Sequence, residues 1–224
     1  MTQFLNQSDS DFVKSRFEEE MVHDVRLTLF TEPDLKGLLV PGMDCETCAP
    51  TQQLLEEVSL LSEKIQLDVV NHREDRELTE SYGVARVPTI VFSRDDESNV
   101  KYLGIPAGTE FPVLLEAIIN VSSGSPALSE ETISFLSSLE EEISIKVFVT
   151  PKRPYCPGVA SLAHAMAVTS DKIDAEVIEV QEFPELGRTF GVRGVPLTVI
   201  NGSISFTGAA NEQMLVEHLK SAVE

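Results

Sequence analysis

The chain repeats itself at one long, fixed interval, and no other feature constrains its fold as strongly. The segments "YGVARVPTIVF" at 82–92 and "FGVRGVPLTVI" at 190–200 share an aromatic residue, Gly-Val, Val-Pro and an apolar run. The interval from Pro88 to Pro196 equals the interval from Cys48 to Cys156 (196 − 88 = 156 − 48 = 108). A period this long far exceeds the unit of a stacked array, so it predicts two duplicated domains.

The two halves also share an order of secondary structure. Each begins with an apolar, β-branched run typical of a buried strand, and a helical pattern follows each cysteine region. A second strand, a helix, the strand after Val-Pro, a further strand, a Gly turn and a closing helix complete each half. The expected first and second strands are residues 25–31 and 66–72 in the first half and 145–150 and 175–180 in the second. This order predicts an α/β fold with a mixed sheet.

The segment that joins the halves, "SSGSPALSEETISFLSSLEEE", opens with Gly, Ser and Pro and then turns helical near Ser129. Residues 8–22 match it as the first helix of the other half. We therefore place the boundary near residue 123, which gives units of residues 1–122 and 123–224.

Composition excludes several classes of protein. The net charge is −20, from 17 basic and 37 acidic residues, which argues against nucleic acid and anionic membrane as partners. The sequence has no apolar run long enough to span a membrane and no secretory signal, so we expect a cytoplasmic protein. Three cysteines are too few, and odd in number, for a secreted disulfide scaffold.

Two of the cysteines form the motif Cys45-Glu46-Thr47-Cys48. In a cytosolic chain with βαβ patterning, this spacing predicts thiol–disulfide chemistry. A structural or incidental pair is the plain alternative. Zinc needs about four ligands, and the chain offers three cysteines and four scattered histidines, so we predict no metal. An iron–sulfur cluster shared between chains is a still weaker alternative.

The chain resembles the protein disulfide oxidoreductases of thermophiles, glutaredoxin-like proteins with two fused thioredoxin-fold units. The segments "YLGIPAGTEF" and "VFVTPKRPYCPGVA" and both Val-Pro turns carry the resemblance, which spans nearly the whole chain. It implies two tandem thioredoxin-like domains, each a central mixed β-sheet flanked by helices. It also implies a Cys-x-x-Cys motif and a facing cis-proline in each unit. The first motif matches at Cys45 and Cys48, whereas the second is Arg153-Pro154-Tyr155-Cys156, so we expect a degenerate second site.

The expected chemistry assigns a role to each matched residue. At a helix N-terminus a thiolate is stabilised by unpaired N–H groups, so Cys45 would attack and Cys48, one turn inside, would resolve. Pro88 would be cis, with the Val87 backbone pairing with an extended substrate peptide. Val195 and Pro196 form the corresponding turn of the degenerate site.

The expected partners follow from this assignment. Protein disulfides would be the substrates, and a thioredoxin-reductase-like flavoenzyme or a small thiol would be the reductant. No cofactor beyond the redox-active disulfide is needed.

The surroundings of Cys45 add two expectations. Asp44 and Glu46 oppose a thiolate electrostatically, which predicts a reducing couple of about −270 to −200 mV. Thirteen residues, 32–44, separate Thr31 from Cys45, whereas only Pro151 and Lys152 precede Arg153 after the matching strand. That longer loop could cover the dithiol.

Several alternatives stay open. Cys156 is either an inert buried thiol or half of a long-range or intermolecular disulfide, and Arg153 is either a surface residue or a binder of anions or partners. An electron relay to a peroxiredoxin is one rival function, because the N-terminal region of the alkyl hydroperoxide reductase flavoprotein also pairs one live and one degenerate unit, in reversed order. A non-enzymatic binding scaffold is the other. Disulfide isomerase activity is less favoured, since one complete site remains.

Overall fold

The computed structural model describes residues 4–32, 45–95 and 97–223. Predictions about Met43, Asp44 and the rest of the loop after Glu32 therefore lie outside the described residues. The elements of the first half are α1 (Gln7–Glu20), β1 (Val25–Thr31), α2 (Cys48–Ser59), β2 (Ile65–Asn71), α3 (Arg76–Ser81), β3 (Thr89–Arg94), β4 (Glu97–Leu103), the 3₁₀ turn η1 (Gly108–Glu110) and α4 (Phe111–Ser123).

Strands of the first half follow the order β2-β1-β3-β4. β1 pairs in parallel with β2, with Val25 opposite Ile65, and antiparallel with β3. Six of the seven residues of β1 are buried, as its run of apolar residues predicts for a central strand covered on both faces.

The second half repeats this arrangement with strand order β6-β5-β7-β8. This confirms the predicted α/β fold class with a mixed sheet in each half. Its elements are α5 (Glu130–Ser137), β5 (Ile143–Val149), α6 (Cys156–Thr169), β6 (Ile173–Glu179), α7 (Pro184–Thr189), β7 (Leu197–Ile200), β8 (Ile204–Thr207) and α8 (Glu212–Lys220).

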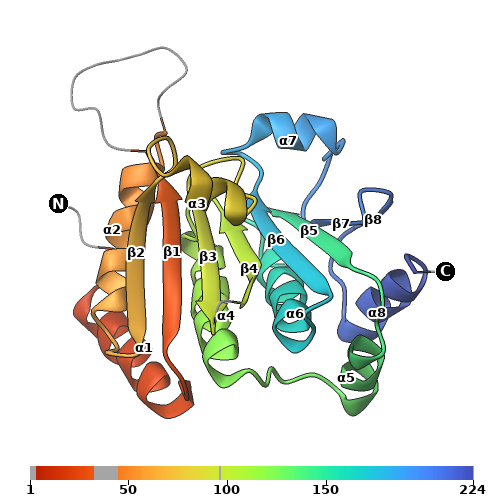
Figure 1. Ribbon diagram of the computed structural model, residues 1–224, viewed down its shortest axis with the longest axis horizontal. Helices are drawn as coiled ribbons and strands as arrows, with labels where there is room; N and C mark the ends of the chain where they lie inside the picture. The colour runs from red at the N-terminus through yellow and green to blue at the C-terminus, as the bar shows by residue number, and fades with distance from the viewer. Residues whose placement is uncertain (1–3, 33–44, 96, 224) are drawn as a thin grey trace.

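The two half-sheets join into one sheet of eight strands, as Figure 1 shows. β4 pairs in parallel with β6, with Val100 opposite Ala175. Side chains close the seam: Asn99 Nδ2 donates to the carbonyls of Ala167 at 2.6 Å and Ile173 at 2.8 Å. One apolar cluster extends through both halves, so the units share a core as well as a sheet.

The junction also contains a buried histidine. His164 of α6 is 1% exposed, and its Nε2 lies 3.0 Å from the carbonyl oxygen of Lys101 in β4. Burial lowers the pKa of His164 to about 4, so the imidazole is neutral at physiological pH. It therefore works as a packing and hydrogen-bonding group between the units.

The helix that follows the cysteine pair begins earlier and ends earlier than its sequence pattern indicates. The pattern predicts residues 51–65, whereas α2 spans Cys48–Ser59. Pro50 fits because the first turn of a helix needs no N–H donor there. Ile65 already belongs to β2, where it pairs with Val25. No helix among the described residues is long and apolar enough to cross a membrane.

Candidate active site beside the junction of the two units

Cys45 and Cys48 form a disulfide at the N-terminus of α2, with their Cα atoms 5.3 Å apart. The N–H of Cys48 donates to the carbonyl of Cys45 at 3.3 Å, which closes the turn between them. Cys48 is 2% exposed, whereas Cys45 is half-buried. Cys45 is therefore the more accessible of the two cysteines.

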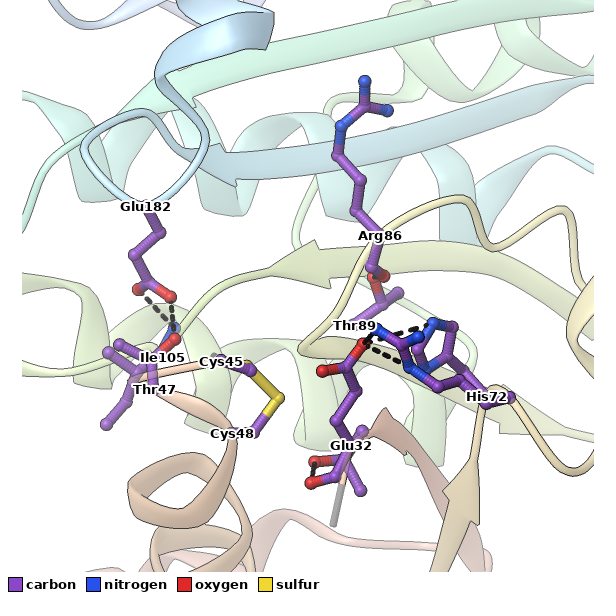
Figure 2. Close-up of a disulfide and its surroundings, with 11 residues drawn as sticks. Glu32, Cys45, Thr47, Cys48, His72, Arg86, Thr89, Ile105 and Glu182 are labelled. Atoms are coloured by element: carbon purple, nitrogen blue, oxygen red, sulfur yellow. Dashed lines mark hydrogen bonds and ion pairs between the residues drawn. A yellow bond between two sulfur atoms is a disulfide. The ribbon is translucent and has the colours of Figure 1, made fainter. Parts of the chain in front are cut away.

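The loop before β3 contains the first Val-Pro turn. The Val87–Pro88 peptide bond is cis, and Val87 is half-buried. Two hydrogen bonds fix the loop: Gly104 N donates to the carbonyl of Pro88 at 2.9 Å, and Thr89 Oγ1 donates to the carbonyl of Arg86 at 2.7 Å. In the view of Figure 2 the disulfide lies between Arg86 and Thr89 on one side and Thr47 and Glu182 on the other.

Glu182 reaches the cysteine turn from the second unit. Its Oε2 accepts a hydrogen bond from Thr47 Oγ1, and its Oε1 accepts from Ile105 N at 2.8 Å. Thr47 lies between the two cysteines and is the N-cap of α2. A carboxylate of one unit is thus bonded to the dithiol motif of the other, and no sequence spacing indicated this contact.

A second acid group lies on the opposite side of the disulfide. Glu32 follows β1, and its Oε1 lies 2.7 Å from Arg73 Nη2 and 3.5 Å from His72 Nε2. Figure 2 shows this group near the disulfide. The ion pair ties the end of β1 to the end of β2, which fixes the chain just before the loop that leads to Cys45. Two opposite charges so far apart in the chain gave no usable signal in the sequence.

Buried acidic groups cluster at the seam behind Glu182. Glu110 of η1 is fully buried, and neither of its carboxylate oxygens has a partner among the described residues. Burial, with a contribution from Glu179, raises the pKa of Glu110 to about 8. Burial also raises the pKa of Tyr102, and Glu110, Glu179 and Glu182 add to that shift. Glu110 thus keeps a proton at neutral pH that an ordinary carboxyl group would release.

The degenerate site has the turn of the first site without its disulfide. The N–H of Cys156 donates to the carbonyl of Arg153 at 3.2 Å, so Arg153 occupies the position of Cys45. Arg153 is exposed, and Cys156 is free and fully buried. Burial, reinforced by Glu110 and opposed by Arg153, raises the pKa of the Cys156 thiol. The Val195–Pro196 peptide bond is cis, and Pro196 is buried.

The sequence model of a thioredoxin domain matches residues 143–220, within the second unit. The thioredoxin of Methanocaldococcus jannaschii is 34% identical over 80 residues, which are 35% of this chain and 94% of that protein. The chain belongs to the thioredoxin family. The match of the domain model therefore falls on the unit whose motif has lost its first cysteine.

Two further relatives share the tandem arrangement or most of the chain. A protein disulfide oxidoreductase from Aeropyrum pernix has a TM-score of 0.86 and 29% identity, and the match covers 98% of this chain and 95% of that one. The F subunit of the alkyl hydroperoxide reductase of Xanthomonas campestris pv. phaseoli is 25% identical over 166 residues. That match covers 74% of this chain, which spans 30% of the length of that relative. The fold of two tandem thioredoxin-like units is thus confirmed.

The geometry of the first unit suits disulfide exchange. A helix N-terminus provides unpaired N–H groups that stabilise a thiolate, and the two sulfurs are already bonded. No group of three or more His, Cys, Asp or Glu side chains suited to a metal ion occurs in residues 4–32, 45–95 and 97–223. The described site thus offers a thiol pair and acids around it.

Proposed function

We propose that this thioredoxin-family protein is a thiol–disulfide oxidoreductase that uses Cys45 and Cys48 to reduce or exchange protein disulfides. The observation that carries the proposal is the disulfide itself, at a helix N-terminus, with Cys45 accessible and Cys48 buried. The more accessible Cys45 can attack a substrate disulfide, and the buried Cys48 can then resolve the mixed disulfide.

The proposed reaction has two exchange steps. The Cys45 thiolate attacks a substrate disulfide, a mixed disulfide forms, and one substrate sulfur leaves as a thiolate. Cys48 then loses its proton and attacks Cys45 Sγ, which releases the second substrate thiol. The substrate has gained two electrons, and the protein holds the Cys45–Cys48 disulfide. A thioredoxin-reductase-like flavoenzyme or a small thiol, available in the cytoplasm, would return two electrons, and no resident cofactor takes part.

The cis peptide loop completes the proposed site. We assign Val87 and Pro88 to substrate binding, with the half-buried Val87 offering its backbone to an extended peptide, as in other modes of strand pairing. Such pairing reads main-chain groups and so accepts many sequences. We assign residues 1–122 to the catalytic unit and residues 123–224 to a unit that no longer has its own dithiol, because Arg153 stands where a nucleophile would be.

A thiol count across glutathione redox buffers tests the proposal. Free thiols are trapped by alkylation and counted by mass, and we expect a reversible change from three to one. Cys45→Ser should abolish the change. Cys156→Ser is the matched control, because it removes the cysteine at the corresponding position of the second unit, and its count should change from two to zero at the same midpoint. Counts that stay constant across the buffers would reject the proposal.

A dedicated electron relay to a peroxiredoxin-type peroxidase is the second candidate. The similarity to the F subunit of alkyl hydroperoxide reductase over 74% of this chain favours it. Reduction of a purified peroxiredoxin and of insulin should be compared at equal protein concentration. Fast turnover with the peroxiredoxin and poor turnover with insulin would select the relay, and the reverse would select a general reductase. A dithiol inert with both would favour a binding scaffold.

A further inference from the structure

Glu182 is placed where it can act on the dithiol of the other unit. It lies in the turn between β6 and α7, and its carboxylate accepts from Thr47 Oγ1 and from Ile105 N. Thr47 is the residue that follows Glu46 inside the cysteine motif. Figure 2 shows the carboxylate beside the turn that carries Cys45 and Cys48. The contact therefore joins the second unit to the N-terminus of the helix on which the proposed chemistry depends.

The chain leaves space for this carboxylate. Gly104 has a φ of +101°, and a Cβ built on it would lie 2.7 Å from Glu182 Oε1 and 2.9 Å from the Cβ of Glu179. Any side chain at position 104 would thus displace the two acids. The backbone of Gly104 also holds the Val87–Pro88 loop through its bond to the Pro88 carbonyl. Gly104 therefore both holds the Val87–Pro88 loop and leaves room for the Glu182 carboxylate.

The groups that face Glu182 are mostly acidic. Glu179 Oε2 accepts from the N–H of Glu182 at 2.8 Å. Glu110, Glu179 and Glu182 all contribute to the raised pKa of Tyr102 on β4. From the turn that leads into α2, the group bonded to Glu182 is the Thr47 hydroxyl. Burial raises the pKa of Glu182, while the bonds from Thr47 and Ile105 oppose that change. No cation bonds to Glu182 among the described residues.

The repeat shows that this contact belongs to the first site alone. The residue that corresponds to Glu182 in the first unit is Glu74 (182 − 108), which is exposed. The residue that corresponds to Thr47 in the second unit is Tyr155 (47 + 108), which is 68% exposed. The difference arises because β6 pairs with β4 inside the sheet, whereas β2 lies at its outer edge.

We propose that Glu182 is a positioning residue through which the second unit controls how readily the Cys45–Cys48 dithiol ionises. This inference rests on the proposed redox function of that pair. The negative charge near the N-terminus of α2 opposes a thiolate and offsets part of the stabilisation that the free N–H groups provide. The carboxylate also holds the Thr47 side chain and so fixes the turn between the sulfurs. The second unit, which has no dithiol of its own, would in this way adjust the one that remains.

The pH dependence of alkylation tests the proposal. The reduced wild type, Glu182→Gln and the matched control Glu74→Gln are treated with iodoacetamide at a series of pH values, and labelling of the Cys45 peptide is timed by mass. We expect Glu182→Gln to move the inflection of the rate to lower pH by about half to one unit, with about threefold to tenfold faster labelling below it. Glu74→Gln should leave the inflection in place.

Each other result has a definite meaning. An unmoved inflection in folded Glu182→Gln would overturn the proposal, and so would a rate that changes equally at all pH values, because that pattern reports a loosened turn and not a charge effect. If Glu182→Gln fails to fold, Glu182→Ala removes the same charge and should move the inflection in the same direction; no movement again overturns the proposal. Failure of the proposed function is separate: the thiol count would then stay constant in glutathione buffers.

Discussion

Glu110 makes the stability of this protein depend on pH, and the substitution Glu110→Gln exposes that dependence. The side chain is fully buried, and its pKa rises from the ordinary 4.5 to about 8. Between these values the folded chain keeps a proton that the unfolded chain releases. The associated stability is present below about pH 4.5 and is lost as the pH rises to about 8.

The magnitude follows from the two pKa values. At about 1.36 kcal/mol per pH unit, the interval corresponds to about 5 kcal/mol lost above pH 8 and about 3 kcal/mol lost at pH 7. This is a large part of the roughly 5–15 kcal/mol that holds a typical domain together. A neutral glutamine has no proton to release, so Glu110→Gln should not show this loss.

Urea unfolding at pH 5, 6, 7 and 8 measures the effect. The glutamine amide also needs partners, so the absolute stability of the variant is not the test. The expected result is a difference between variant and wild type that grows in favour of the variant with pH, by up to about 1.4 kcal/mol per unit. The exposed Glu140 provides the control, since Glu140→Gln should follow the wild type. Parallel curves for wild type and Glu110→Gln would refute the reasoning.

Three further predictions concern the sites and the seam. Cys48→Ser should accumulate a mixed disulfide at Cys45 with a disulfide substrate, detected by mass, because no second thiol can resolve it; an equal yield of adduct in the wild type would contradict this. Arg153→Cys should restore a second disulfide, because the turn from Arg153 to Cys156 matches that from Cys45 to Cys48, and the oxidised variant should have no free thiol; a Cys156 that still alkylates after unfolding would oppose it. Asn99→Ala should lower the free energy of unfolding in urea by about 1–3 kcal/mol, because it removes the side chain that donates to the carbonyls of Ala167 and Ile173. An unchanged unfolding midpoint would show that Asn99 does not stabilise the junction between the units.

The sequence predicted most of the fold because both halves of the chain contain the same pattern of strands and helices. The repeat aligns two cysteine regions and two Val-Pro turns, so each half supports the interpretation of the other. Runs of β-branched residues then marked the strands closely. The predicted helix after the cysteine pair began at Thr51, whereas α2 already begins at Cys48. Pro50 weakens the helical pattern there, although a proline is tolerated in the first helical turn.

Local patterns also indicated the candidate site in the first unit. The motif from Cys45 to Cys48 and the Val87–Pro88 turn lie in short segments whose residue types carry the signal. Glu182, Glu110 and Glu32 were missed, because each works through groups that are distant in sequence. A buried glutamate in a chain with 37 acidic residues looks like any solvated one until its surroundings are known.

The sequence by itself determined two similar α/β halves, one complete cysteine pair and one motif in which arginine replaces cysteine. These are properties of short segments and of their spacing, which the chain states directly. Only the tertiary structure decided that β4 and β6 pair to make one sheet, because which sheet edges meet depends on contacts between segments far apart in the chain. That pairing brings Glu182 to Thr47 and leaves its counterpart Glu74 in solvent. The two halves, alike in sequence pattern, thereby acquire different environments.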